Sequence, residues 1–221
     1  MKKLLLSTFI LLFTCVCSFA QGTIEFSVEA PASISGAYGF SSTNDVAGWG
    51  SPDLTDTANA VMDTLMFVED GTVGTNPQGN PLSQEGCFPL TNNLTGKIAV
   101  IWRNTCEFGA KIINAQNAGA RAVIIINREP GLVNMAPGSD GAFCTIPAVF
   151  VDSADGAIIA NEMANGPVVA FMGNLPDAVN YITACDSYTW INGNTYTSST
   201  ASPTFTYTNA SGVDSVVSLN L

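Results

Sequence analysis

Residues 97–126 carry a strand–helix–strand pattern, which constrains the fold more than any other part of the chain. Residues 97–102 read Lys-Ile-Ala-Val-Ile-Trp, a short and nearly all-apolar run that is typical of a strand buried on both faces. From Phe108 the apolar positions take a helical spacing that Gly119 can end, and residues 122–126 are again apolar and rich in isoleucine. The pattern predicts a βαβ unit with two parallel strands and a right-handed crossover.

A second strand–helix–strand succession follows. Residues 146–151 read as a strand with a proline near its start, where a missing N–H does least harm. Asp152 or Ser153 is a candidate cap for a helix that stops at Gly166, and residues 167–171 return as a strand. The two successions together predict an α/β body.

Upstream of these units, residues 60–68 predict another strand. Asp70 and Gly71 follow it and give a hairpin-type turn signal. Residues 69–86 are rich in Gly, Pro, Asn and Gln, so we expect a long exposed loop there.

The composition changes after residue 174. Residues 180–221 are dominated by Thr, Ser, Asn and Tyr, with a turn signal at Asn192 and Gly193 and candidate strands at 204–208 and 216–221. A piece of about forty residues buries little core by itself. It therefore either packs on the α/β body or belongs to a longer protein that continues beyond it.

The first twenty residues have the form of a removable signal peptide. Lys2 and Lys3 precede an apolar run at 4–13, and Ser18 and Ala20 occupy the −3 and −1 positions before a cleavage point. The apolar run is too short to span a bilayer comfortably, and no later run is longer. We expect an exported protein, secreted or at the cell surface, with no membrane span.

Charge and histidine content exclude several functions. Without the signal, 5 basic residues stand against 18 acidic ones, a formal charge of −13, so nucleic acid and anionic lipid are not expected partners. The chain has no histidine, which excludes a Ser-His-Asp triad, a Cys-His pair and a His-ligated catalytic zinc.

Four cysteines remain after the signal: Cys87, Cys106, Cys144 and Cys185. An even number in an oxidising compartment favours disulfides, with three possible pairings. No two of them have the two-residue spacing of a zinc knuckle, so we expect no metal and no cofactor.

Other side chains suggest chemistry only weakly. Asp56 and Asp152 each fit the loose Asp-Ser/Thr-small pattern of aspartic peptidases, but a loop aspartate and a helix cap are the favoured roles. Lys111 is expected on the polar side of its helix as a solvated lysine rather than a desolvated base. Arg103 is expected to anchor its loop, the alternative being contact with a partner's carboxylate.

Five short motifs occur in one order along the chain. They are Gly-Cys-x-Pro-Leu at 86–90, Gly-Lys-Ile-Ala-Val-Ile at 96–101, Arg-x-x-Cys-x-Phe-x-x-Lys at 103–111, Asn-Ala-Gln-x-Ala-Gly-Ala at 114–120 and Ile-Pro at 146–147. This ordered set resembles the protease-associated (PA) domain over about residues 24–173.

The resemblance implies a swivelling β/β/α fold and a non-catalytic role. PA domains are carried by secreted or vacuolar peptidases, sorting receptors and membrane ubiquitin ligases, where they bind partners or shape substrate access. The resemblance also implies a Cys87–Cys106 disulfide. Asn104 departs from the glycine that usually follows the arginine, and asparagine tolerates the left-handed backbone that such a turn would use.

The end of the chain has a resemblance of its own. Residues 184–190, 193–196 and 212–221 are similar to a short β repeat of large bacterial secreted proteins. Such copies often carry a cysteine where this chain has Val213, which leaves Cys185 without an expected local partner.

The sequence thus predicts a signal peptide at 1–20, a PA-like α/β domain at 21–174 and a small, possibly incomplete β module at 180–221. The predicted function is a secreted, non-catalytic module that binds a protein or peptide partner. The alternative is an accessory region of a secreted peptidase whose catalytic domain lies outside this chain.

Overall fold

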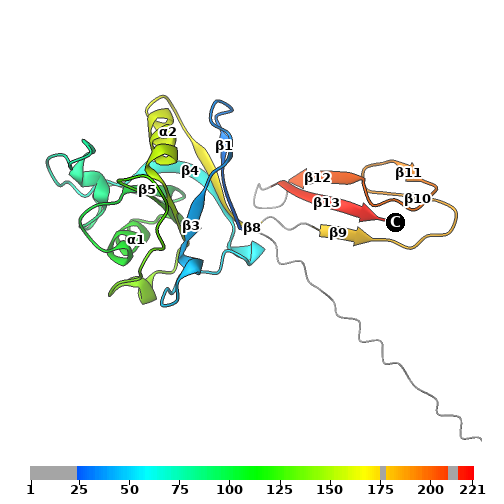
Figure 1. Ribbon diagram of the computed structural model, residues 1–221, viewed down its shortest axis with the longest axis horizontal. Coiled ribbons are helices and arrows are strands. Elements are labelled where there is room, and N and C mark those ends of the chain that lie inside the picture. The colour runs from blue at the N-terminus through cyan, green and yellow to red at the C-terminus, as the bar shows by residue number, and fades with distance from the viewer. Residues whose placement is uncertain (1–23, 175–177, 209–213) are drawn as a thin grey trace, which may run out of the picture.

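The computed structural model describes residues 24–174, 178–208 and 214–221. The predicted signal peptide lies outside the described residues. Figure 1 shows an α/β body, coloured blue to yellow, followed by a group of short strands in orange and red.

An eight-stranded mixed sheet forms the α/β body. In the order in which they pair, its strands are β2 (Gly36–Ala37), β1 (Ile24–Ala30), β8 (Val169–Asn174), β4 (Val61–Phe67), β5 (Ile98–Trp102), β6 (Ala122–Ile126), β7 (Ala148–Val151) and β3 (Phe40–Ser42). The four strands β4 to β7 run parallel, while β3 pairs antiparallel with β7, and β8 pairs antiparallel with both β4 and β1.

Two α-helices and four short 3₁₀ turns connect these strands. They are α1 (Phe108–Asn117), α2 (Ser153–Met163), η1 (Thr43–Asp45), η2 (Thr57–Asn59), η3 (Leu82–Glu85) and η4 (Gly141–Phe143). Helix α1 joins β5 to the parallel strand β6, which confirms the predicted βαβ unit. Gly119 follows α1 with φ of +92°, a left-handed conformation that suits glycine at a helix end.

Two predicted connections differ from the structure. Strand β8 does not pair with β7 to complete a second βαβ unit, because it lies between β1 and β4 instead. The strand predicted at 60–68 is present as β4, but no hairpin follows it. The carboxylate of Asp70 accepts backbone hydrogen bonds from Thr72, Cys87 and Phe88, so this residue fixes a loop rather than a two-strand turn.

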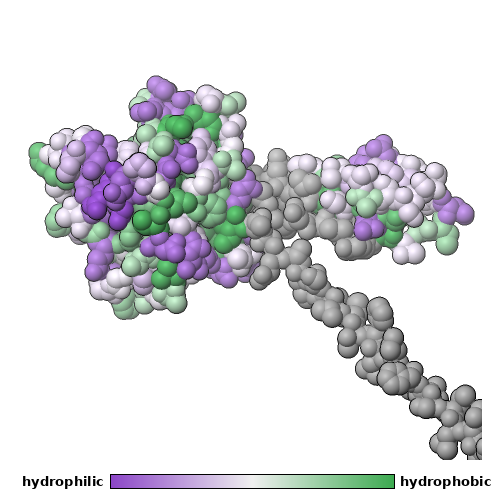
Figure 2. All heavy atoms as spheres, viewed as in Figure 1, coloured by the Kyte–Doolittle hydropathy of each residue, from purple (hydrophilic) through white to green (hydrophobic). Residues whose placement is uncertain are grey.

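The alternation of side chains along the strands creates a separate core on each face of the sheet. On one face Ile98, Val100 and Ile124 pack with Ile159 of α2. On the other face the adjacent positions pack with α1; they include Ala99, Ile101, Val123, Ile125 and Phe150. Figure 2 shows apolar side chains at the surface where α2 lies, in keeping with Ile158, which is 45% exposed.

The C-terminal strands form two small sheets. Strands β12 (Thr204–Thr208), β13 (Asp214–Asn220) and β9 (Ala178–Tyr181) pair in that order, and β10 (Tyr188–Thr189) pairs with β11 (Thr195–Tyr196). Gly193, with φ of +79°, lies in the turn between β10 and β11, at the turn signal read from the sequence. Among the described residues of this part, the buried cluster consists of Trp190, Val217 and Leu219. Over the described parts of the chain, no helix has the length and apolar character needed to cross a membrane.

Candidate functional site

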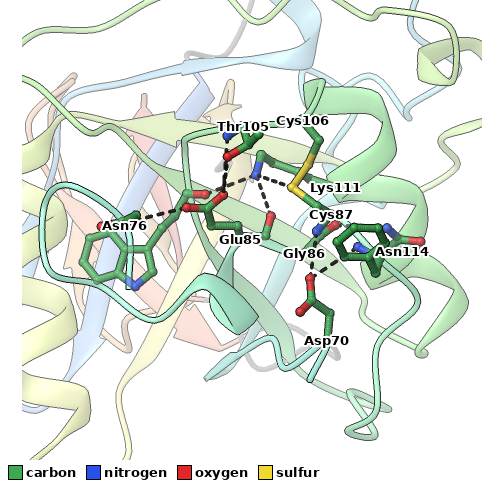
Figure 3. Close-up of a disulfide and its surroundings, with 11 residues drawn as sticks. Asp70, Asn76, Glu85, Gly86, Cys87, Thr105, Cys106, Lys111 and Asn114 are labelled. Atoms are coloured by element: carbon green, nitrogen blue, oxygen red, sulfur yellow. Dashed lines mark hydrogen bonds between the residues drawn. A yellow bond between two sulfur atoms is a disulfide. The ribbon is translucent and has the colours of Figure 1, made fainter. Parts of the chain in front are cut away.

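A group of polar and charged side chains of the α/β body lies around one disulfide (Figure 3). The bond joins Cys87 to Cys106, 19 residues later. Cys87 follows η3 through Gly86, whose φ of +63° turns the chain at the end of that 3₁₀ turn. Cys106 lies in the short connection between β5 and α1. The disulfide therefore ties the loop after β4 to the entrance of α1.

Lys111 lies beneath this disulfide and is fully buried. Its Nζ donates to the carbonyl oxygens of Glu85 at 2.5 Å and Trp102 at 3.3 Å, and it lies 3.7 Å from Cys87 Sγ. The expectation of a solvated lysine is wrong. The spacing of Lys111 from Phe108 and Ala115 places it at the border of the inward-facing stripe of α1, and its long stem carries the ammonium to the end of β5.

Burial changes the acidity of this lysine. Loss of hydration lowers the pKa of Lys111 from 10.5 to about 8, although the negative charges of Glu85 and Asp70 act in the opposite direction. The lysine has no carboxylate at ion-pair distance within the described residues. Its ammonium contacts backbone carbonyls directly, and the negative charges of Glu85 and Asp70 stabilise it from a greater distance.

Glu85 is 2% exposed and organises the loop above the lysine. Its Oε1 accepts from Asn76 Nδ2 at 3.2 Å, and its Oε2 accepts from Thr105 Oγ1 at 3.0 Å and Thr105 N at 3.4 Å. Asn76 is also buried, and its Oδ1 accepts from the backbone of Gln78 and Asn80. The loop predicted as exposed thus contains a buried polar network. Asn76 accepts hydrogen bonds from the backbone of the loop itself, and Glu85 accepts hydrogen bonds from the turn before α1.

Asp70 and Asn114 hold the backbone on either side of Cys87. Asp70 Oδ2 accepts from Cys87 N at 3.1 Å and Phe88 N at 3.3 Å. Asn114 of α1 donates from Nδ2 to the carbonyl of Gly86 at 3.0 Å. Figure 3 shows both side chains directed at this short segment. Backbone hydrogen bonds and the disulfide together fix its position.

Two adjoining hollows open beside the disulfide. One, of about 370 Å³, lies between η3 and the turn before α1 and has Leu82 and Phe88 in its wall. The other, of about 320 Å³, lies between that turn and residues 136–138, with Arg103 in its wall. Thr105 and Cys106 line both hollows.

Arg103 has the anchoring role expected from the sequence. Its Nη1 donates to Asn127 Oδ1 at 2.8 Å and lies 3.5 Å from Glu129 Oε1, and its guanidinium lies over the rings of Phe108 and Phe150 at 5.8 and 5.9 Å. These contacts join the ends of β5, β6 and β7.

The turn next to Arg103 differs from expectation. Among the described non-glycine residues Asp186 alone has a positive φ, so Asn104 does not use a left-handed backbone.

The two candidate peptidase aspartates are helix caps. Asp56 accepts from Ala58 N at the start of η2. Asp152 accepts from the backbone N–H groups of Ala154 at 2.8 Å and Asp155 at 2.9 Å at the start of α2, as the cap interpretation predicts. Each carboxylate is used to satisfy the first turn of a different helix.

The remaining two cysteines differ in exposure. Cys144 is a buried free thiol, and burial, with a further contribution from the charge of Asp140, raises its pKa to about 11. Cys185 is a free and exposed thiol in the C-terminal part. Neither lies in the network around the Cys87–Cys106 bond.

Glu85 and Asn76 were not singled out from the sequence, and Asp70 was interpreted only as a turn residue. Their only sequence signal is position, because Glu85 directly precedes the Gly-Cys motif and Asp70 follows a strand. Lys111 did carry a signal, since a lysine three residues after Phe108 and four before Ala115 borders the apolar stripe.

Comparison with known proteins agrees with this geometry. A sequence model of the PA domain matches residues 64–159. "Aminopeptidase YwaD" of Bacillus subtilis is 34% identical over 110 residues, 48% of this chain and 24% of that protein. "Signal peptide peptidase-like 2" of Arabidopsis thaliana is 36% identical over 89 residues, 39% of this chain and 16% of that protein. The chain thus spans no more than about a quarter of either relative.

Among solved structures, an aminopeptidase from Aneurinibacillus sp. strain AM-1 is similar with a TM-score of 0.47 and 20% identity. That similarity covers 74% of this chain and 39% of the other. The residues matched to the PA family run from β4 into α2 and include the disulfide, Glu85 and Lys111. The chain therefore carries a PA domain at residues 64–159.

Proposed function

We propose that the chain is a secreted, non-catalytic interaction module that binds a protein or peptide partner beside the Cys87–Cys106 disulfide. The observation that carries this proposal is the pair of adjoining hollows that share Thr105 and Cys106. A rigid wall surrounds them, because the segments on both sides are held by the disulfide, Glu85 and Asp70. A fixed concave surface lowers the ordering cost of binding.

The polar groups at the hollows support a binding role over catalysis. Glu85 accepts hydrogen bonds from the protein through both carboxylate oxygens, and Asp70 does the same. Arg103 is engaged by Asn127. A general base or nucleophile needs a lone pair or proton directed at a substrate, and these groups are instead directed at the chain itself.

An exposed aromatic residue points to a protein or peptide as the ligand. Phe88 is 59% exposed at the wall of the larger hollow, and Leu82 adds an apolar contact on the η3 side. Aromatic side chains next to a concave surface are frequent anchors in protein interfaces. The hollow is also bordered by the acidic residues Asp70 and Glu85, which favours peptides that carry a cationic residue.

A peptide-binding measurement tests this function. The purified chain is screened against a random peptide array, and the dissociation constants of the best binders are compared for the unaltered chain, Phe88→Ser and Phe143→Ser. Phe143 is a matched control, because it is 69% exposed and lies outside both hollows. We expect Phe88→Ser to weaken binding about tenfold and Phe143→Ser to leave it unchanged. No binder, or an equal loss in both variants, contradicts the proposal.

The same array tests the absence of catalysis. Cleavage of any peptide by the purified chain, over a pH range from acid to neutral, would overturn the non-catalytic assignment. Asp152→Asn is the informative variant there, because an aspartic mechanism would be lost with it.

A second candidate function is an accessory region of a secreted peptidase. It is favoured by the similarity to an aminopeptidase of which this chain covers 24%. The complete coding sequence distinguishes the two, because a peptidase motif in an adjoining domain supports the accessory role and further β repeats support an interaction module. Export is tested separately by N-terminal sequencing of protein from the culture medium, where a start at Gln21 is expected.

A further inference from the structure

The two sulfur atoms of the disulfide have different surroundings. Cys106 lines both hollows, whereas Cys87 lines only the larger one. Cys87 Sγ has the buried ammonium of Lys111 at 3.7 Å on its inner side. Both cysteines are half-buried, so the two sulfur atoms are distinguished by the second hollow beside Cys106 and by the positive charge beside Cys87.

Lys111 is placed to stabilise an anion at Cys87. Its two short contacts are neutral backbone carbonyls, those of Glu85 and Trp102. The carboxylate of Glu85 is directed at Asn76 and Thr105 instead, so it does not neutralise the ammonium by direct contact. A buried cation that lacks a contacting anion gains more from a thiolate than a solvated lysine would.

We propose that Cys106 is a site of thiol modification, at which an external thiol of the thioredoxin or glutathione class opens the disulfide while Lys111 stabilises the departing Cys87 thiolate. The external thiolate attacks Cys106 Sγ and forms a new S–S bond as the Cys87–Cys106 bond breaks. The electron pair of the broken bond goes to Cys87, which leaves as a thiolate beside the Lys111 ammonium. A second thiol, from the same dithiol protein or from a second glutathione, then attacks the external sulfur of the mixed disulfide and releases Cys106. Two thiols are thus oxidised to one disulfide for each bond reduced.

The other charges near the disulfide do not reverse this preference. Arg103 and Glu107 line the smaller hollow beside Cys106, and their charges are opposite. Arg103 is also held by Asn127. Asp70 accepts from Cys87 N, and Glu85 accepts from Thr105 N next to Cys106. Each cysteine therefore has one carboxylate bonded to the backbone beside it, and these negative charges disfavour a thiolate at both sulfurs. Lys111 is the charge that distinguishes Cys87, since its Nζ contacts that sulfur from a fully buried position.

The reaction has a structural consequence that does not depend on the proposed binding function. Opening the bond unties the segment after η3 from the turn before α1. Because Cys106 lies in the wall of both hollows, the attached thiol occupies space in them. The modification thus alters the surface beside Phe88 whether or not a peptide binds there.

The deciding experiment locates the glutathione adduct in a chain that keeps Cys87, Cys106 and Lys111 unchanged. The full chain carrying Cys185→Ser, which removes the exposed competing thiol, is exposed briefly to reduced glutathione and quenched with acid. Peptide mass spectrometry then locates the adduct. We expect glutathione on Cys106 and a free thiol at Cys87 in most of the singly modified molecules. An adduct found mainly on Cys87, spread equally over both residues, or absent from both overturns the proposal.

A pair of lysine variants tests the role of the charge. Lys111→Met keeps most of the length of the side chain and removes its ammonium, and Lys97→Met is the control at a lysine outside the disulfide network. We expect Lys111→Met to slow glutathione-dependent opening on the order of 3- to 10-fold, because the leaving thiol loses its stabilising charge, and Lys97→Met to leave the rate unchanged. An equal rate in all three proteins assigns no role to Lys111 and contradicts the mechanism. If Lys111→Met unfolds, the location of the adduct in the chain that keeps Lys111 decides whether the proposal holds.

Discussion

The two faces of the eight-stranded sheet are each covered by one helix, and the two helices are held by different means. Helix α2 is held by close apolar packing, because a Cβ added at Gly156 would lie 2.1 Å from Ile126 Cγ2. Helix α1 packs Ile112 and Ala115 on its own face, but it also buries Lys111, and a disulfide constrains its entrance.

The α2 face is thus a packing interface, whereas the α1 face holds loops in fixed positions. On the α2 face, shape complementarity alone sets the distance between helix and sheet. On the α1 face, a covalent bond and hydrogen bonds fix loops that no strand supports, and the two hollows open between those loops. The α1 face should therefore respond to redox conditions and protonation, and the α2 face to changes in side-chain volume.

The largest effect is expected from removing the covalent bond on the α1 face. The double variant Cys87→Ala/Cys106→Ala frees a loop with a sequence separation of 19 residues, and we expect the free energy of unfolding to fall by about 3 kcal/mol. Urea unfolding followed by circular dichroism measures this loss. The control Cys185→Ala alters an exposed free thiol and should change stability by less than about 0.5 kcal/mol. If the double variant were as stable as the control, the hydrogen bonds alone would hold the α1 face.

Protonation of Lys111 should give the next largest effect. Burial lowers the pKa of Lys111 from 10.5 to about 8, so between these pH values the unfolded chain binds a proton that the folded chain has lost. Stability attributable to this residue should therefore rise as pH increases from about 8 to 10.5, by roughly 3 kcal/mol in total. The measurement is the difference in unfolding free energy between the unaltered chain and Lys111→Met at several pH values. This difference cancels the opposite contribution of Cys144, whose pKa is raised to about 11.

A pH-independent difference would show that the Lys111 ammonium is as well solvated in the folded chain as in the unfolded one. The α1 face would then lack the electrostatic character that distinguishes it from the α2 face.

The α1 face also shows what the sequence could and could not predict. The unit β5–α1–β6 was predicted because the change from strand to helix periodicity lies within a continuous stretch of about thirty residues. The position of Lys111 was not, because its partners Glu85 and Cys87 lie more than twenty residues away in a loop without periodicity. Side chains that satisfy distant backbone groups leave almost no local pattern.

Strand β8 presents the same limit at the level of topology. Its apolar sequence was recognised, but its place between β1 and β4 was not. Pairing of β8 with β1 joins residues that are 139 to 150 positions apart, from Ala30 with Val169 to Ile24 with Asn174. An apolar run predicts a buried strand without naming its neighbours, so the preceding helix suggested a βαβ unit that the structure does not contain.

On the α2 face, volume should matter more than charge. Gly156→Ala adds a methyl group that meets Ile126, and we expect a loss of about 1 to 2 kcal/mol after the gain in helix propensity is included. Gly166→Ala is the matched control, because an added Cβ there meets nothing within 4 Å. Both changes are compared by thermal and urea unfolding. Equal stability of the two variants would mean that α2 can shift to accommodate the methyl group. Close packing would then not be what holds α2 on the sheet.

The smallest effect is expected at the start of α2, where one polar group does contribute to that face. Asp152→Ala removes an acceptor for the N–H groups of Ala154 and Asp155 and should cost about 1 kcal/mol. Asp152→Asn keeps an acceptor oxygen and loses only the favourable charge at the helix N-terminus, so its cost should be a few tenths of a kcal/mol. Urea unfolding of both variants, together with the peptide cleavage assay, separates a cap from a catalytic carboxylate. If Asp152 is a cap, stability falls from the unaltered chain to Asp152→Asn to Asp152→Ala, and none of the three proteins cleaves a peptide. If its carboxylate is catalytic, the unaltered chain cleaves peptides, and Asp152→Asn abolishes cleavage without a matching loss of stability.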